Sequence, residues 1–274
     1  MVKIIVDSTA NLRPALRERV AVVPLTVHFG QEEYVDGVNL SAEAFYRKLA
    51  VCKELPTTSQ AAPYDFGKLF KAAVAAGDTV VAIVVSSALS GTCQSACIAA
   101  AEYPGKVFVV DSRSIAIGSG ILTEYALELV DRGLDAAAIA AELDAVKEKV
   151  RLFAVVDTLE YLQRGGRLSK TVAIAGGLLS VKPIISLEDG SIKMAGKARG
   201  NKQANALMDE SVQAKGVDWD KPCMLGYTGT DDELLQKYRE QSDIWTGDVF
   251  SALVCGVVGT HVGPGAVAVA FFSK

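Results

Sequence analysis

Short apolar runs alternate with longer helix-like segments through the first half of the chain. The run at residues 79–85 is apolar on both faces, which is typical of a central parallel strand, and the runs at residues 3–7 and 106–110 predict two further buried strands. Residues 20–29 predict one or two more strands. Helices are expected over residues 41–55, 63–76, 92–101, 115–132 and 135–149. Strands that alternate with helices in this way predict a doubly wound sheet.

The second half has a different pattern, in which neighbouring strands favour hairpins. Asp189-Gly190 is a strong turn signal between two strands. The other elements expected are strands at 152–156, 223–227, 249–254 and 266–272, and helices at 158–163, 202–215 and 231–241. We interpret the glycine-rich segment between the last two strands as a loop. The whole pattern predicts a two-domain α/β protein, with a mostly parallel sheet in residues 1–150 and a mixed sheet in residues 151–274.

The length of the chain agrees with two domains, and its charge argues against some classes of function. At 274 residues the chain exceeds a usual single domain, and half of its residues are hydrophobic. A net charge of −4 argues against a nucleic-acid-binding protein, which needs a basic surface. The first residues do not resemble a secretory signal, and glycines interrupt the apolar C-terminal region before it reaches membrane-spanning length. We therefore expect a cytoplasmic protein.

Neither the cysteines nor the glycines indicate a metal or a nucleotide. The cysteines are odd in number and lack C-x-x-C spacing, so we expect reduced, buried thiols at Cys52, Cys93, Cys97, Cys223 and Cys255. The chain has no P-loop, and no G-x-G-x-x-G motif follows its first strand. No cofactor and no metal are expected.

Three short polar stretches form a candidate site for a small anion. They are residues 56–60 with Thr57, Thr58 and Ser59, residues 89–92 with Ser90, Gly91 and Thr92, and residues 259–265 with His261. Ligands of doubly wound sheets bind at the carboxyl ends of strands, and a helix N-terminus attracts anions, which favours the second stretch. The alternative is that the hydroxyls only cap helices or turns and that His261 is a structural imidazole.

Arginines beside glycines are further candidates to hold an anion. Arg164 and Arg167 flank Gly165-Gly166, and Arg199 precedes Gly200. The alternative is that these side chains are exposed and contribute only to solubility. We take Arg167 and Arg199 as candidates in preference to Arg164.

These stretches resemble the DegV family, bacterial fatty-acid-binding proteins that carry the acyl chain for a two-component fatty-acid kinase. The matching segments are residues 7–10, 23–25, 56–60, 86–92, 157–162, 164–167, 182–183, 259–261 and 263–265. They span nearly the whole chain in the expected order. Two departures are visible, because Cys93 replaces a common aromatic residue and Ala61 a common proline.

The resemblance implies a carrier without catalytic activity of its own. A single long-chain fatty acid would be buried where the two domains meet, with its carboxylate on Thr58 and Ser90 and with His261 close by. The secondary head-group or partner surface would comprise Thr57, Ser59, Gly91, Thr92, Arg167 and Arg199. A separate kinase subunit would convert the bound acid to an acyl phosphate for phospholipid synthesis. We expect a monomer without nucleic acid, and allow for transient contact with a membrane.

Two enzymatic alternatives have less support in the sequence. Ser90 as nucleophile and His261 as base would give an esterase or hydrolase that acts on a lipid or a small acyl ester. However, Ser90 lacks the G-x-S-x-G context, and no obvious carboxylate is placed to orient His261. A self-sufficient kinase would need a nucleotide-binding loop, which the sequence does not contain.

Overall fold

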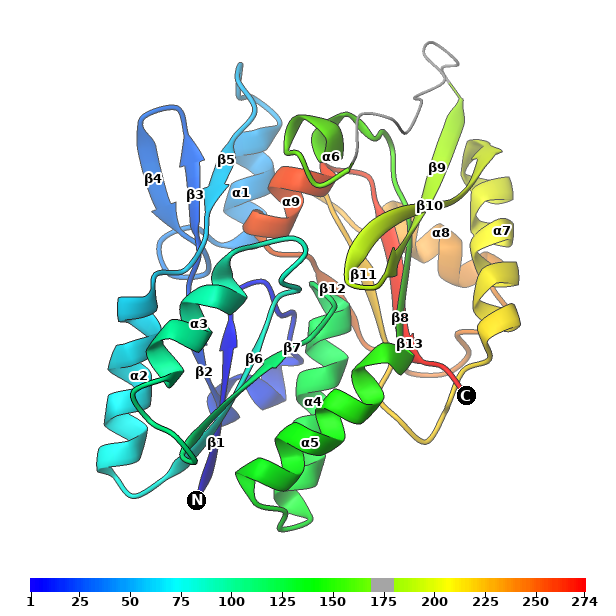
Figure 1. Ribbon diagram of the computed structural model, residues 1–274. Coiled ribbons are helices and arrows are strands. Elements are labelled where there is room, and N and C mark those ends of the chain that lie inside the picture. The colour runs from blue at the N-terminus through cyan, green and yellow to red at the C-terminus, as the bar shows by residue number, and fades with distance from the viewer. Residues whose placement is uncertain (169–179) are drawn as a thin grey trace.

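Two large β-sheets with helices packed around them form the body of the molecule (Figure 1). The computed structural model describes residues 1–168 and 180–274. A small three-stranded sheet lies beside the first large sheet. The α/β fold with one parallel and one mixed sheet confirms the fold class predicted from the sequence.

The first sheet contains four parallel strands and is covered by helices on both faces. Its strands, in spatial order, are β2 (Val20–Val23), β1 (Val2–Asp7), β6 (Thr79–Val84) and β7 (Val107–Asp111). The helices are α2 (Pro63–Ala75) and α3 (Thr92–Ala100) on one face, and α4 (Ile117–Asp131) and α5 (Ala136–Val146) on the other. Ile5 packs on the α2 side, whereas Ile4 and Val6 pack on the α4 side, as the alternation along a strand requires. The sheet is therefore doubly wound.

The second sheet is mixed and contains six strands. In spatial order they are β10 (Ser191–Arg199), β9 (Val181–Glu188), β8 (Val150–Val155), β13 (Val267–Phe272), β11 (Met224–Tyr227) and β12 (Ser251–Leu253). Helices α7 (Gly200–Lys215) and α8 (Glu233–Gln241) cover one face. Leu152 and Phe272 on the other face join the core that contains α4. Helix α4 therefore packs against both large sheets.

The hairpin predicted at Asp189-Gly190 is confirmed. Strands β9 and β10 pair antiparallel, and both turn residues have positive φ, 49° at Asp189 and 73° at Gly190. Positive φ at both central residues is the conformation of a type I′ turn, which fits the twist of the flanking strands.

None of the helices in the two described ranges is both long and apolar enough to cross a membrane.

The small sheet departs from the sequence-based expectation. It contains β4 (Glu32–Val35), β3 (Thr26–Phe29) and β5 (Thr57–Ser59), all antiparallel. From the sequence we predicted no strand at Thr57–Ser59 and kept a turn or a cap as the alternative to a binding role, but Thr58 pairs with Val27 across the sheet. Threonine also suits a half-buried strand, and the distant partner strand decided between the two conformations.

The segment around His261 also departs from the expectation, because it is a helix rather than a loop. Helix α9 (Gly256–Val262) packs on α1 (Ala42–Leu49). A Cβ on Gly259 would lie 2.5 Å from Tyr46 Oη, and one on Gly256 would lie 3.0 Å from the Phe45 ring. We interpreted these glycines as loop markers, but they allow two helices to approach closely. The chain leaves the helix only at Gly263, where φ is 76°.

The close α9–α1 packing predicts different effects for two helical Gly→Ala substitutions. Gly259→Ala should lower the free energy of unfolding by about 1–3 kcal/mol, because the added methyl group overlaps Tyr46. Gly67→Ala in α2 meets no atom within 4 Å and should raise it by about 0.5–1 kcal/mol. Urea denaturation of both variants tests this difference, and equal effects would contradict the packing role of Gly259.

Candidate functional site

The candidate site lies at the carboxyl ends of β1 and β6, where the strand order of the first sheet reverses. Ligands of such sheets bind in the crevice at this switch point. The buried carboxylate of Asp7 fixes the two loops there, since it accepts hydrogen bonds from Thr9 N (2.9 Å) and Val85 N (2.6 Å). Burial raises the pKa of Asp7, and these hydrogen bonds act in the opposite direction. Thr9 and Val85 both face the cavity described next.

A cavity of about 330 Å³ occupies this position and is polar at one end. Its polar lining comes from the loop after β1, from β5 and the residue after it, from the segment just before α3, from the segment after α6 (Glu160–Arg164), and from α9. The polar lining residues are Thr9, Thr58, Ser59, Gln60, Ser90, Gly91, Arg167 and His261. The apolar ones are Leu25, Val85, Leu89, Ile115, Leu162, Ile192, Val257, Val258 and Val262. The structure thus brings the three polar stretches singled out in the sequence to one cavity.

His261 and Thr58 are in direct contact inside the cavity. The distance between His261 Nε2 and Thr58 Oγ1 is 2.8 Å, and His261 Nδ1 is buried without a hydrogen-bond partner in the described part of the chain. Burial, and secondarily the positive charge of Arg167, lower the pKa of His261 to about 4. The ring is therefore neutral at pH 7 and offers one N–H donor and one acceptor.

Arg167 brings a fixed positive charge close to this pair. Its Nε donates to Leu89 O (3.1 Å) and its Nη1 to Gly165 O (2.7 Å). Among the described lining residues it is the only charged side chain. Gly165 also approaches the histidine closely, because a Cβ there would overlap His261 Nδ1. The segment after α6 therefore holds both the guanidinium and the imidazole in place.

Ser90 combines a structural contact with a place in the cavity lining. Its Oγ accepts a hydrogen bond from Thr92 N (3.2 Å) and lies 3.0 Å from Thr92 Oγ1, at the start of α3. Gly91 lies against the Gln60 side chain, which a Cβ would overlap, and Gln60 Nε2 donates to Ser95 Oγ (3.0 Å). These contacts join the β5 segment to the start of α3.

Four of the residues considered in the sequence analysis lie outside the cavity lining. Thr57 is exposed on β5, and Thr92 is buried beneath Ser90. Arg199 is exposed at the start of α7, where its Nε donates to Ser180 Oγ (3.3 Å). Arg164, the weaker candidate, pairs with Glu160 on its own helix at 2.6 Å.

The contacts of His261 give no support to the hydrolase alternative. Its Nε2 is bonded to Thr58 rather than to Ser90, whose Oγ bonds Thr92. Within the described residues no carboxylate reaches His261 Nδ1, where a catalytic triad places its orienting group.

A second cavity adjoins the first between the two large sheets. The resemblance implied a buried acyl chain where the domains meet, but none of the residues that line this cavity was singled out from the sequence. The second cavity has a volume of about 50 Å³ and a predominantly apolar lining that includes Ala116, Ala154 and Ala268. Four residues line both cavities, namely Ile115, Ile192, Val258 and Val262. Individual alanines in strands that otherwise carry large side chains, Ala154 in β8 and Ala268 in β13, are the sequence signal for this space. Together the cavities match an amphiphile with a small polar head.

The low pKa of His261 predicts a pH dependence of stability. The unfolded ring gains a proton near pH 6.5 but the folded ring only near pH 4. The free energy of unfolding should therefore fall as the pH decreases through this window, and His261→Gln should reduce that fall. Burial raises the pKa of Asp36 to about 6, which acts in the opposite direction. Since Asp36 is present in both proteins, its effect cancels in the difference.

The measurement is urea denaturation of ligand-free protein at several pH values. His28→Gln provides the control, because His28 is the other histidine and does not line the cavity. Identical pH profiles for His261→Gln and the unsubstituted protein would contradict a buried, neutral His261.

Comparison with known proteins assigns the chain to a family. A family model described as "Uncharacterised protein, DegV family" matches residues 1–274. A DegV domain-containing protein of Caldanaerobacter subterraneus is 35% identical over 280 residues, which cover 100% of this chain and 99% of the relative. Two solved structures each cover 100% of this chain, with 99% of their own chain aligned. A fatty-acid-binding DegV family protein from Thermus thermophilus is 31% identical (TM-score 0.89), and a stearic acid-binding protein from Eubacterium ventriosum is 27% identical (TM-score 0.84). This chain belongs to the DegV family.

Proposed function

We propose that this protein binds a single long-chain fatty acid and presents its carboxylate to a separate kinase subunit. The observation that carries the proposal is a cavity with one polar end that continues into an apolar cavity between the sheets. The fatty acid and stearic acid named for the two structural relatives support the same class of ligand. The carboxylate would lie at Thr58 and Ser90, beside His261, with the acyl tail directed past Ile115 and Ile192.

The acyl tail would supply most of the affinity. Burying a tail of about 14 methylenes at about 0.8 kcal/mol each stabilises the complex by on the order of 11 kcal/mol. Lost translational and rotational freedom opposes this term, so the net affinity is smaller. The head-group end therefore needs only to satisfy the carboxylate rather than to provide strong binding.

The polar end suits a carboxylate that must react later. Hydroxyl donors from Thr58 and Ser90 satisfy the oxygens, because a buried carboxylate without partners would be protonated or expelled. Arg167 adds a favourable positive charge, but its Nε and Nη1 already donate to backbone carbonyls. Those two nitrogens are not free to form a two-pronged pair that would draw electron density from the carboxylate. We therefore propose that the hydroxyls leave the carboxylate nucleophilic.

The exposure of the site favours delivery to a partner. Ser59, Gln60 and Gly91 line the polar end and are exposed, whereas the apolar cavity lies between the two sheets. A kinase subunit could reach the carboxylate without displacing the tail. A carboxylate oxygen would then attack the terminal phosphoryl group of the donor held by the kinase, which gives an acyl phosphate and releases the donor's leaving group. We propose the exposed Thr57 and Arg199 as parts of the docking surface rather than of the head-group site.

The direct test of ligand class is denaturing extraction of the purified protein followed by mass spectrometry. We expect one equivalent of a long-chain fatty acid, or uptake of added stearic acid by protein from which lipid has been removed. If no fatty acid co-purifies and the lipid-free protein also takes up no added stearic acid, the proposal is contradicted.

The proposed role of the hydroxyls predicts a separation of binding from reaction. Thr58→Ala and Ser90→Ala should each slow phosphoryl transfer by the cognate kinase subunit about tenfold, the effect of losing a hydrogen bond of about 1.4 kcal/mol. Binding of stearic acid should fall much less, because the tail contacts remain. Thr57→Ala on the same strand lies outside the cavity lining and is the control for binding. An equal loss of binding and of phosphoryl transfer in the first two variants would count against this role.

A further inference from the structure

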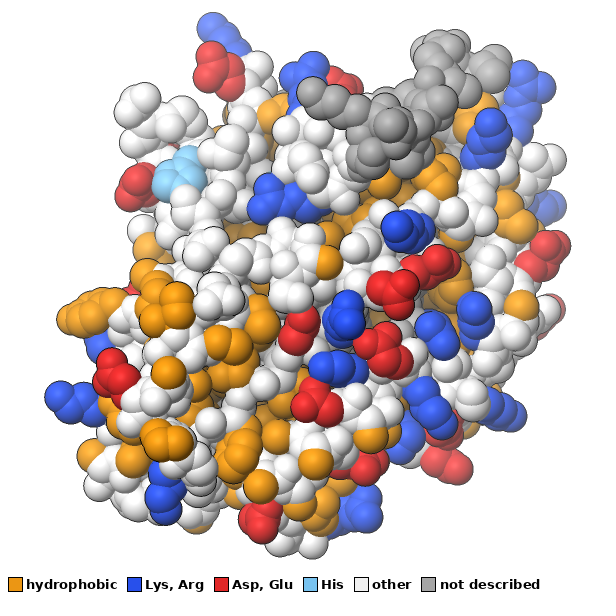
Figure 2. All heavy atoms as spheres, viewed as in Figure 1, with side chains coloured by type: hydrophobic (Ala, Val, Ile, Leu, Met, Phe, Trp, Pro, Cys, Tyr) orange, Lys and Arg blue, Asp and Glu red, His pale blue; other side chains and the backbone are white. Residues whose placement is uncertain are grey.

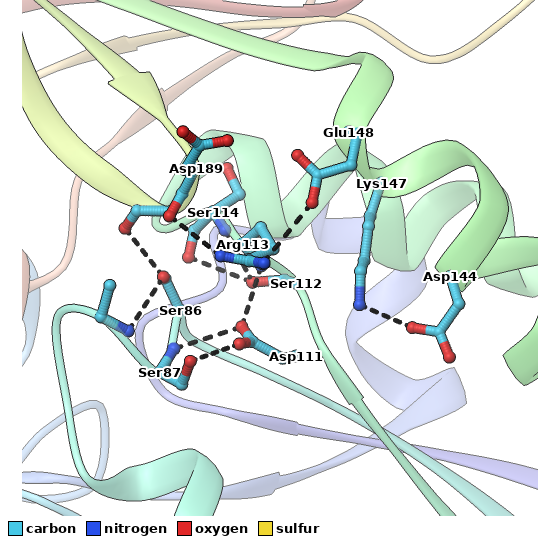
Figure 3. A network of polar contacts seen from close by, with 12 residues as sticks. Ser86, Ser87, Asp111, Ser112, Arg113, Ser114, Asp144, Lys147, Glu148 and Asp189 are labelled. Atoms are coloured by element: carbon cyan, nitrogen blue, oxygen red, sulfur yellow. Dashed lines mark hydrogen bonds and ion pairs between the residues drawn. The ribbon is translucent and has the colours of Figure 1, made fainter.

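The tip of the β9–β10 hairpin docks onto the loops of the first sheet (Figure 3). Ser86 Oγ donates to Gly190 O (2.8 Å), and Arg113 Nη1 donates to Asp189 O (3.0 Å). Gly190 is buried although it lies in a hairpin turn, and a Cβ there would overlap Ser86 Oγ. We call these four residues the clasp. On the face shown in Figure 2, acidic and basic side chains lie close together around this junction.

Backbone strain is concentrated around the clasp. Within the described residues, three non-glycine residues have positive φ, namely Arg113 (51°), Ala116 (53°) and Asp189 (49°). Asp189 has this conformation as part of its type I′ turn, which favours it. Arg113 and Ala116 lie outside that turn, where such conformations cost about 1–3 kcal/mol each and persist only if the surroundings hold them. Two of the three belong to the clasp, and the third follows Arg113 by three positions. Strain of this kind is typical of segments whose exact position matters for function.

A hydrogen-bond network holds the strained loop after β7 in place (Figure 3). Asp111 Oδ1 accepts from Arg113 N (3.0 Å) and from Ser87 N (3.2 Å), which connects the loops after β6 and β7. Ser112 Oγ donates to Ser114 O (3.0 Å), and Ser86 N donates to the same carbonyl (2.9 Å). The loop is therefore a firm base for the hairpin tip.

Two side chains close to the clasp in the sequence line both cavities. Ile115 lies between the strained residues Arg113 and Ala116, and Ile192 follows Gly190 by two positions on β10. Both line the two cavities together with Val258 and Val262, and we call these four residues the neck. All four are β-branched, so their side chains have few rotamers and give the neck a well-defined width. Ile192 is on the hairpin and Ile115 is on the loop, whereas Val258 and Val262 are on α9, so the position of the hairpin relative to the loop would affect the width on one side of the neck.

We propose that the clasp positions Ile192 opposite Ile115 so that the neck admits an unbranched acyl tail and rejects a tail broadened by a methyl branch. This inference rests on the proposed function, because it concerns the ligand of the same site. The acyl tail must pass the neck to reach the apolar cavity. A firm clasp keeps the neck narrow, and a loosened clasp allows a broader tail to enter.

The test is a competition between stearic acid and a methyl-branched acid of the same carbon number. The two acids bury nearly equal apolar area, so their ratio in the bound fraction, measured by mass spectrometry, reports the width of the neck. Gly190→Ala should displace the hairpin tip, because its Cβ overlaps Ser86 Oγ. We expect the preference for stearic acid to fall about tenfold, which corresponds to about 1.4 kcal/mol.

Gly105→Ala is the matched control. Gly105 has a φ of 71°, close to the 73° of Gly190, but a Cβ there meets nothing within 4 Å. Both substitutions therefore strain the backbone alike, and only Gly190→Ala disturbs the clasp. Gly105→Ala should keep the preference of the unsubstituted protein. An unchanged preference in folded Gly190→Ala protein would overturn the proposal.

Two further tests keep the outcome decisive if Gly190→Ala does not fold. Ile192→Ala widens the neck without touching the clasp and should lower the preference similarly. Arg113→Gly tolerates the positive φ but removes the donor to Asp189 O, so it should also lower the preference for stearic acid. Arg113→Lys retains a side-chain donor and should keep that preference closer to that of the unsubstituted protein. Unchanged selectivity in Ile192→Ala and Arg113→Gly would overturn the proposal. Failure of the unsubstituted protein to take up either acid would instead contradict the proposed function.

Discussion

The packing of helix α4 against both large sheets is the constraint on which the site depends. One continuous apolar core contains residues of α4, of the parallel sheet and of the mixed sheet. The start of this helix is tied to the loop after β1, since Asn11 N donates to Ala116 O (3.2 Å). Ala116 and Ile117 consequently line the apolar cavity, whereas Ile121 and Leu122 complete the core. The same helix therefore joins the sheets and shapes the space between them.

The two ends of the combined cavity solve different physical problems. In the proposed complex the apolar end would remove the acyl tail from water, and its contribution to binding would grow with the length of chain that it buries. In that complex the polar end would have to satisfy a carboxylate in a partly dry environment, where burying a neutral imidazole and hydroxyls costs less free energy than burying further charges. Arg167 provides one positive charge there, and backbone carbonyls fix its position.

The sequence pattern alone predicted the elements whose conformation depends mainly on residues close by in the chain. The buried strands of the first sheet, the turn at Asp189-Gly190 and the position of Ser90 before α3 all follow from periodicity and turn chemistry. Other elements form only because they pair with segments far away in the sequence. Thr58, for example, is in a strand because β5 pairs with β3. The helical state of His261 depends on close packing of Gly259 against Tyr46, and glycine alone does not distinguish such packing from a loop. The cavities and the clasp arise where loops from both sheets meet, which no local pattern encodes.

The crystal structure of the protein with bound stearic acid is the most direct test of the central claim, that one continuous cavity holds a fatty acid by both ends. We expect the carboxylate within hydrogen-bonding distance of Thr58 and Ser90, and the tail between Ile115 and Ile192 in the space between the sheets. A carboxylate at another position, or a tail that lies outside the neck on the protein surface, would contradict the account.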